Sequence, residues 1–172
     1  MADKAIVDGY LDIVTQAEIR LNGEFPNIFQ ALKEVLYRLP EDIFISFTKD
    51  MPLFFFVLPE IGASGGYLKE AHEPIDLKKG FRIIQLRAEL NSMDIPSIMG
   101  VVIHEFAHAY LHCSYTHKGT EEEEADKLAI EWGFKNEIYA AGTNPAIIAL
   151  REKIRFYLPT KIKAEEGANG HL

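Results

Sequence analysis

The feature that most constrains the fold is an apolar helical segment in the second half of the chain. Residues 97–113 contain no helix breaker except Gly100, and apolar side chains lie on nearly every side of the helix that they would form. Just upstream, Ser92 or Asp94 can cap this helix and Pro96 suits its first turn. A helix that is apolar all round is buried. We therefore expect the rest of the chain to pack around it.

The remainder of the chain contains both helical and strand patterns. Apolar residues at helical spacing predict five further helices, over residues 2–21, 26–39, 120–132, 134–140 and 144–158. Runs of β-branched and aromatic residues predict three strands, over 43–47, 53–58 and 81–87. No repeat or Ser/Pro-rich linker divides the 172 residues. We expect one α+β domain over residues 1–160, with N-terminal helices in 1–40, a small sheet in 41–90, further helices in 94–158 and a polar tail at 161–172.

Composition excludes several classes of function. Lys and Arg number 18 against 26 Asp and Glu, a net charge of −8 that argues against a nucleic-acid partner, because phosphate binding needs a basic surplus. The single cysteine, Cys113, excludes an internal disulfide framework and is typical of a reducing, cytoplasmic compartment. The longest apolar run, 53–58, is far shorter than the roughly 20 residues that cross a bilayer. We expect a cytoplasmic protein without a membrane span.

Two histidines and a glutamate interrupt the apolar helix in the H-E-x-x-H spacing: His104, Glu105 and His108. Residues four apart on a helix project side by side, which suits two ligands of one tetrahedral zinc ion at about 2 Å. Burying such groups costs several kcal/mol unless they are paired or bind something. Glu105 would lie beside the metal, where it can take a proton from a metal-bound water and pass it to a leaving amine. The motif predicts a Zn²⁺ site with Glu105 as the catalytic base.

An acidic run at the start of the next predicted helix offers the third ligand. A catalytic zinc ion takes three protein ligands and keeps one open position. Glu122 and Asp126 are four residues apart, so Glu122 could bind the metal while Asp126 accepts the free N–H of a ligating histidine. Glu121, Glu123 or Glu124 would take this place if the helix were phased differently.

A histidine is the other source of a third ligand. The metzincin pattern is ruled out, because Leu111 and Ser114 stand where it requires Gly and His. His112 continues the stripe of the two motif histidines, but three successive ligands from one straight helix fit a tetrahedron poorly. We expect His112 to support the ligands or to line the site. His117, in the following loop, is an alternative ligand or a transition-state donor.

The combination of His104-Glu105-x-x-His108 with Glu122-x-x-Ala125-Asp126 resembles the gluzincin zinc metallopeptidases, the thermolysin-like group whose third ligand is a glutamate. Among compact members, residues 81–133 are most similar to the minigluzincins and the ImmA/IrrE-like peptidases. The resemblance implies a zincin-like fold, in which a small sheet packs on a central active-site helix, and implies Glu122 as ligand with Asp126 supporting a histidine.

The resemblance also implies how a substrate would bind. The strand at 81–87 would form the upper rim of the cleft, where a substrate backbone adds as a further strand. A transition-state donor in such enzymes lies beyond the third ligand, and Tyr139 is a candidate here, followed by Tyr157 and Arg151.

We therefore expect a zinc-dependent peptidase that hydrolyses a peptide or protein substrate. The alternative is a catalytically weak or latent metal-binding regulatory or interaction protein, because the chain has no obvious second subdomain to build a deep cleft. In a latent enzyme, the N-terminal helices or residues 53–58 would cover the site. Neither the substrate side chains nor the oligomeric state is specified by these motifs, and zinc, nickel and cobalt would all suit the ligands.

Overall fold

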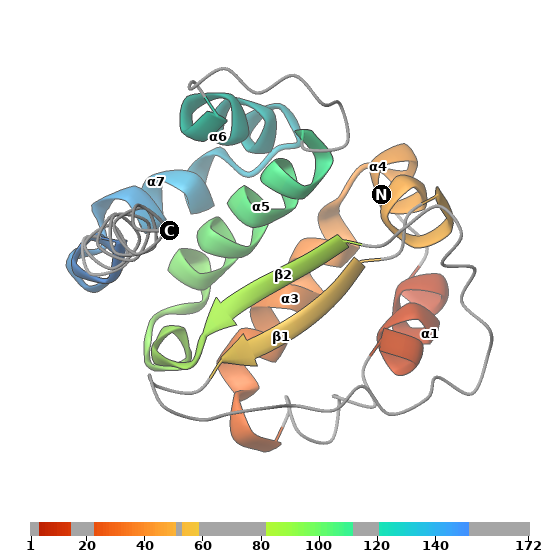
Figure 1. Ribbon diagram of the computed structural model, residues 1–172, viewed down its shortest axis with the longest axis horizontal. Helices are drawn as coiled ribbons and strands as arrows, with labels where there is room; N and C mark the ends of the chain where they lie inside the picture. Colours follow the sequence, from red (N-terminus) through yellow and green to blue (C-terminus); the bar gives the residue numbers. More distant parts are fainter. Residues whose placement is uncertain (1–3, 15–22, 51–52, 59–81, 112–120, 152–172) are drawn as a thin grey trace, which may run out of the picture.

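The computed structural model describes residues 4–14, 23–50, 53–58, 82–111 and 121–151, and these are mostly helical (Figure 1). The elements follow in the order α1 (Lys4–Val14), α3 (Pro26–Arg38), α4 (Glu41–Ile45), the π-helix η1 (Ser46–Asp50), β1 (Leu53–Leu58), β2 (Arg82–Arg87), the 3-10 helix η3 (Ala88–Ser92), α5 (Ile95–Leu111), α6 (Glu121–Glu131) and α7 (Lys135–Thr143). A further helical stretch covers residues 145–151.

Helix α5 is the centre of the described structure, as its apolar sequence predicts. Helices α3, α6 and α7 and strand β2 all pack against it (Figure 1). Its buried residues include side chains on several sides of the helix: Ile98, Met99, Val102, Ile103, Phe106 and Ala107. This packing shields most of the helix that carries the two motif histidines from bulk water.

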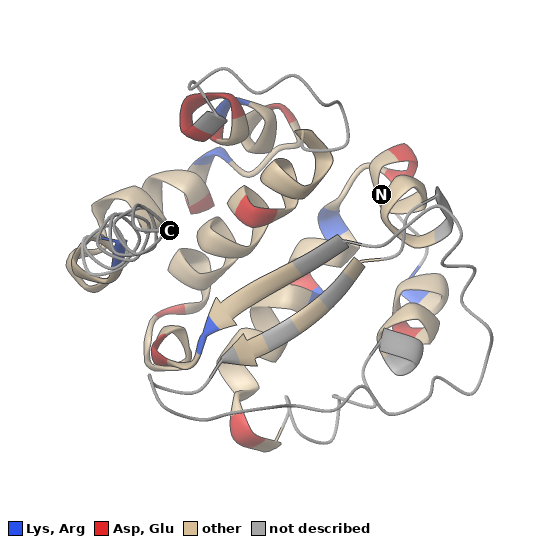
Figure 2. Ribbon diagram, viewed as in Figure 1, with Lys and Arg blue, Asp and Glu red and all other residues tan. Residues whose placement is uncertain are grey.

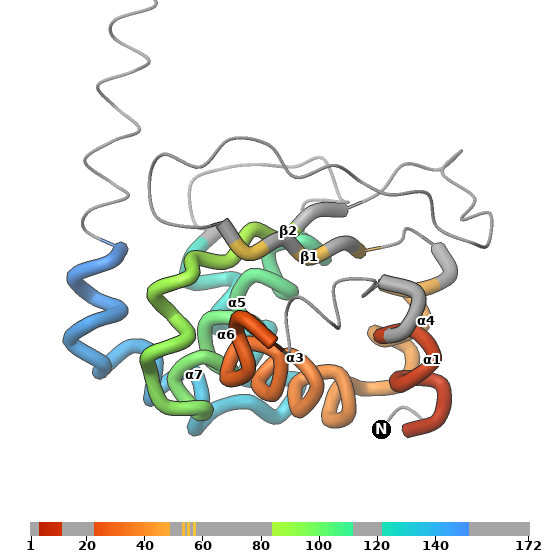
Figure 3. Tube along the Cα trace, turned by 90° about the horizontal axis from the view of Figure 1, so that it is seen from below, coloured from red at the N-terminus to blue at the C-terminus, as the bar shows by residue number. Residues whose placement is uncertain are grey.

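Strands β1 and β2 pair in parallel, with Phe55 opposite Ile84 and Val57 opposite Leu86. Ile84 and Leu86 are buried, whereas Gln85 between them is exposed, which is the alternation expected of a strand with one covered face. Viewed from below, the strands form an outer layer with the described helices beneath it (Figure 3). The predictions of strands at 53–58 and 81–87 are therefore confirmed over Leu53–Leu58 and Arg82–Arg87, and residue 81 lies outside the described residues.

The prediction of a strand over residues 43–47 is wrong, because this segment forms α4 and the start of η1. Ile43, Phe44 and Phe47 are buried, and their spacing of one and four residues is that of a helix face. Glu41 and Asp42 lie in the first turn, where the helix dipole favours negative charge. In a run of only five residues, the apolar pattern cannot distinguish a strand from a helix, so the β-branched and aromatic composition alone gave the wrong prediction.

Side chains cap the starts of α3 and α5, one from a distant segment and one from the residue directly before the helix. Asn91 Oδ1 accepts the backbone N–H groups of Asn27 and Ile28, so that η3 caps the N-terminus of α3. Asp94, one of the two predicted caps of α5, accepts the backbone N–H of Ser97 at 3.0 Å. This hydrogen bond holds the pKa of the Asp94 carboxyl below its usual 3.8. The Asn91 cap ties the start of α3 to η3, the segment that follows β2.

The other predicted helices agree with the structure where it describes them. Helix α3 matches the prediction for 26–39 to within one residue. Helix α6 ends at Glu131, and Gly133 two residues later has a φ of 95°, which suits only glycine well. Helix α7 extends three residues beyond the predicted 134–140. The prediction for 2–21 is matched by α1 as far as Val14, and residues 15–22 and 152–158 of the predicted helices lie outside the described residues.

Candidate metal centre

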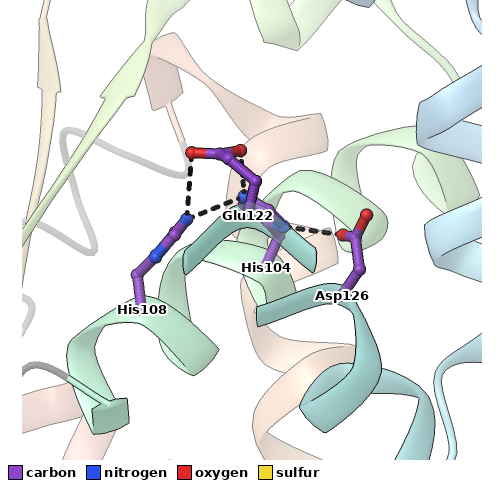
Figure 4. Close-up of polar contacts among 4 residues, drawn as sticks. All are labelled: His104, His108, Glu122 and Asp126. Atoms are coloured by element: carbon purple, nitrogen blue, oxygen red, sulfur yellow. Dashed lines mark hydrogen bonds and ion pairs between the residues drawn. The ribbon is translucent and has the colours of Figure 1, made fainter. Parts of the chain in front are cut away.

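Helix α5 brings His104 and His108 together on one face, one turn apart (Figure 4). Their rings lie edge to face, with centroids 4.5 Å apart, and the two Nε2 atoms are 3.0 Å apart. His104 is buried, with 5% of its side chain exposed, and His108 is partly buried. Because α3, α6, α7 and β2 pack against α5, these two nitrogens are placed by the packed helix and not by a loop.

Helix α6 adds Glu122 to the pair. Its two carboxylate oxygens lie 3.2 Å from His104 Nε2 and 3.4 Å from His108 Nε2, so that the carboxylate spans both rings (Figure 4). The ligand atoms of the three residues all lie within 4.8 Å of one another, and together they could hold a metal ion. Glu122 is the outermost member, with 67% of its side chain exposed.

The donor atoms lie close enough together to hold one small divalent cation. A tetrahedral ion with bonds of about 2.0–2.1 Å has ligand atoms about 3.3–3.4 Å apart, since the edge of a tetrahedron is about 1.63 times the centre-to-corner distance. The two Nε2 atoms are 3.0 Å apart, while one Glu122 oxygen lies 3.2 Å from His104 Nε2 and the other lies 3.4 Å from His108 Nε2. With one ligand atom taken from each residue, the three atoms lie within 4.8 Å of one another. Two imidazole nitrogens and one carboxylate form a donor set that suits zinc and also cobalt or nickel, and they leave a fourth position open.

Asp126 fixes the orientation of His104. Its Oδ1 lies 2.7 Å from His104 Nδ1, on the ring edge opposite the metal group (Figure 4). An ionised carboxylate can only accept, so this contact favours the His104 tautomer that carries its proton on Nδ1 and leaves Nε2 free for a metal ion. Asp126 is one helical turn after Glu122, and α6 therefore supplies both a ligand and the partner that orients another ligand.

The phase of α6 selects among the four consecutive glutamates. Ala125 and Ala129 are fully buried on the side of α6 that faces α5, and Glu122 lies on the same side. Glu123 and Glu124 are exposed and do not belong to the metal group, and the side chain of Glu121 lies outside the described residues. Acidic residues gather at this first turn (Figure 2). The structure thus brings Glu122, and neither Glu123 nor Glu124, to the histidines.

The remaining predicted residues have different outcomes. Glu105 is partly buried and lies about 100° around α5 from His104, beside the metal group and not within it. His112 and His117 lie outside the described residues.

Tyr139 is 73% exposed on α7, and it lies about 200° around that helix from Glu137, whose backbone meets α5 at Gly100. The tyrosine therefore points away from α5, and its placement does not support a role as transition-state donor.

Gly100 is a residue of the site's framework that sequence reasoning treated only as a helix breaker. A Cβ atom at this position would lie 2.1 Å from the carbonyl oxygen of Glu137 and 2.7 Å from Ala141 Cβ. The absence of a side chain lets α7 cross α5 one turn before His104. A glycine within an otherwise unbroken apolar helix was the available signal, since such a glycine often marks a close approach.

Comparisons with known proteins add no relative: no protein-family model matches the chain, and neither a curated protein nor a solved structure is significantly similar to it. Among the helices in the described part of the chain, none combines the length and apolar character needed to cross a membrane.

Proposed function

We propose that the protein is a zinc-dependent peptidase with a gluzincin-type site on a zincin-like domain. The observation that carries this proposal is the convergence of His104, His108 and Glu122, whose ligand atoms lie within 4.8 Å of one another and could hold one metal ion. The Asp126 hydrogen bond to His104 supports it, because ligating histidines commonly donate their second N–H to a carboxylate. The lone cysteine favours a reducing compartment, and we include a cytoplasmic location in the proposal.

In peptide hydrolysis, Glu105 and Asp126 would each have a separate role. A bound zinc ion supplies Lewis acidity, which polarises a carbonyl and makes a water nucleophilic near neutral pH. Glu105 lies next to His104 in sequence and is partly buried beside the metal group, where it would accept a proton from the attacking water and return it to the leaving amine. Asp126 would hold His104 in the tautomer that keeps Nε2 free.

The substrate would bind along β2. Strand β1 occupies one edge of β2, and the Tyr10 hydroxyl donates to the Leu53 carbonyl at 2.7 Å, which ties α1 to β1. In the described part of the chain, β2 pairs with no other strand and packs against α5. A peptide adding to the second edge of β2 would gain backbone hydrogen bonds close to the helix that carries the histidines.

The proposal is tested by changing Glu105 to Gln. We expect this variant to keep a wild-type zinc content and to lose hydrolysis of an unbiased peptide library, because the amide cannot accept the proton. Glu123→Gln, an exposed change outside the metal group, is the matched control and should retain full hydrolysis. Full hydrolysis by Glu105→Gln would refute the mechanism. Bound zinc without hydrolysis in the wild type would favour the alternative, a metal-binding regulatory or interaction protein.

A further inference from the structure

The side of α6 that faces α5 has a metal-group ligand at one end and an aromatic anchor at the other. Glu122, Ala125, Ala129 and Trp132 follow one another at intervals of three, four and three residues, which places them on one helical stripe. Ala125 and Ala129 are fully buried, and Trp132 is buried at the end of the stripe. Its backbone N–H still donates to the Leu128 carbonyl, so Trp132 continues the helical geometry of α6.

The two alanines between the ends allow a close approach but give little resistance to rotation of α6 about its axis. A helix with its side chains has a radius of about 5–6 Å, so a rotation of about 20° moves a side-chain tip by about 2 Å. Such a shift would separate the Glu122 carboxylate from nitrogens that now lie 3.2 and 3.4 Å away. Something other than the alanines must set the angle of this helix.

Trp132 sits among aromatic side chains from two other elements. Its ring is perpendicular to Tyr110 of α5, with centroids 5.6 Å apart at 89°, and to Phe47 of η1, with centroids 6.5 Å apart at 88°. Phe47 in turn meets Phe106 of α5 edge to face at 5.0 Å. Edge-to-face contacts have a defined geometry, unlike contacts between alanines. Tyr110 and Phe106 belong to the helix that carries both histidines.

We propose that Tyr110 and Trp132 are positioning residues for the metal centre: their perpendicular contact sets the rotation of α6 and thereby places Glu122 and Asp126 against the histidines. Neither ring belongs to the metal group, and each acts through the helix that carries it. This inference rests on the proposed metal site, but it does not require that the protein hydrolyse peptides.

The test measures metal binding and coordination geometry in three variants. Tyr110 is 36% exposed, so Tyr110→Leu should fold while losing the perpendicular contact. We expect its zinc affinity to fall at least tenfold and the visible spectrum of its cobalt-substituted form to change. Tyr110→Phe keeps the ring and should restore both. Ile130→Ala, on an exposed part of α6, is the matched control and should behave as wild type.

A metal-free measurement keeps the inference testable on its own. The Nδ1 proton of His104, held by Asp126 at 2.7 Å, should give a protected imidazole N–H signal in nuclear magnetic resonance spectra of the wild type. We expect this signal to be lost in Tyr110→Leu and in Trp132→Leu, and kept in Tyr110→Phe. Wild-type zinc affinity, cobalt spectrum and His104 signal in a folded Tyr110→Leu protein would overturn the inference. A wild type that binds zinc but cleaves no peptide would refute only the proposed function.

Discussion

Replacing Gly100 with alanine should destabilise the protein, although alanine is the better helix former. The new Cβ atom would lie 2.1 Å from the Glu137 carbonyl oxygen and 2.7 Å from Ala141 Cβ. Ordinary contacts between non-bonded heavy atoms are about 3.5 Å, so α7 would have to move by about 1.4 Å to relieve the contact with the Glu137 oxygen. The atom that the new Cβ meets is a backbone atom within a packed helix. A change of side-chain rotamer therefore cannot relieve the clash.

The two opposing terms can be compared directly. Overpacking of a core costs about 1–3 kcal/mol, and a clash with backbone belongs at the upper end of that range. The gain in helix propensity from Gly to Ala is about 1 kcal/mol. We therefore expect Gly100→Ala to lower the free energy of unfolding by about 2 kcal/mol.

Gly142 provides a control in α7 itself. No heavy atom lies within 4 Å of a Cβ atom built there, so Gly142→Ala should gain up to about 1 kcal/mol from propensity alone. Urea unfolding followed by far-ultraviolet circular dichroism gives both values under one set of conditions. A Gly100→Ala protein as stable as wild type, or stabilised like Gly142→Ala, would refute the close α5–α7 approach.

Three further changes probe other contacts. Asp126→Asn should weaken zinc binding about 10–100-fold in competition titrations, because the histidine it supports loses its charged acceptor. Asp94→Asn should lower the free energy of unfolding by about 0.3–1 kcal/mol at pH 7, because the neutral amide can still accept the Ser97 N–H but loses the attraction between the carboxylate and the helix N-terminus. The Asp94 pKa is held below 3.8 by the Ser97 N–H, so this difference should persist above about pH 4 and disappear as the pH falls through the folded-state pKa. Arg38→Met removes the 2.6 Å partner of Glu137, whose side chain is 13% exposed, and should cost about 1–3 kcal/mol by urea unfolding.

The central helix and the histidine pair could be predicted because local sequence determines both. An apolar surface on nearly every side requires burial of α5, and four-residue spacing places His104 beside His108 whatever surrounds them. The strand at 53–58 was equally clear, since six apolar residues between two prolines have no other simple interpretation.

Other features depend on contacts distant in sequence. The choice of Glu122 among four consecutive glutamates follows from the rotation of α6, which tertiary packing of Ala125, Ala129 and Trp132 sets. The helical state of residues 43–47 follows from burial of Phe47 against α5, which overrides a local preference for strand. The parallel pairing of β1 with β2 has no local signal at all.

The central claim is that His104, His108 and Glu122 hold one metal ion, and it is tested most directly by metal content. The wild type, His108→Ala, Glu122→Ala and the exposed control Glu123→Ala would be loaded with excess zinc, dialysed and analysed by atomic emission. We predict close to one zinc ion per chain in the wild type and the control, and a loss of bound zinc in the other two. Stoichiometric zinc retained by both His108→Ala and Glu122→Ala would contradict the site.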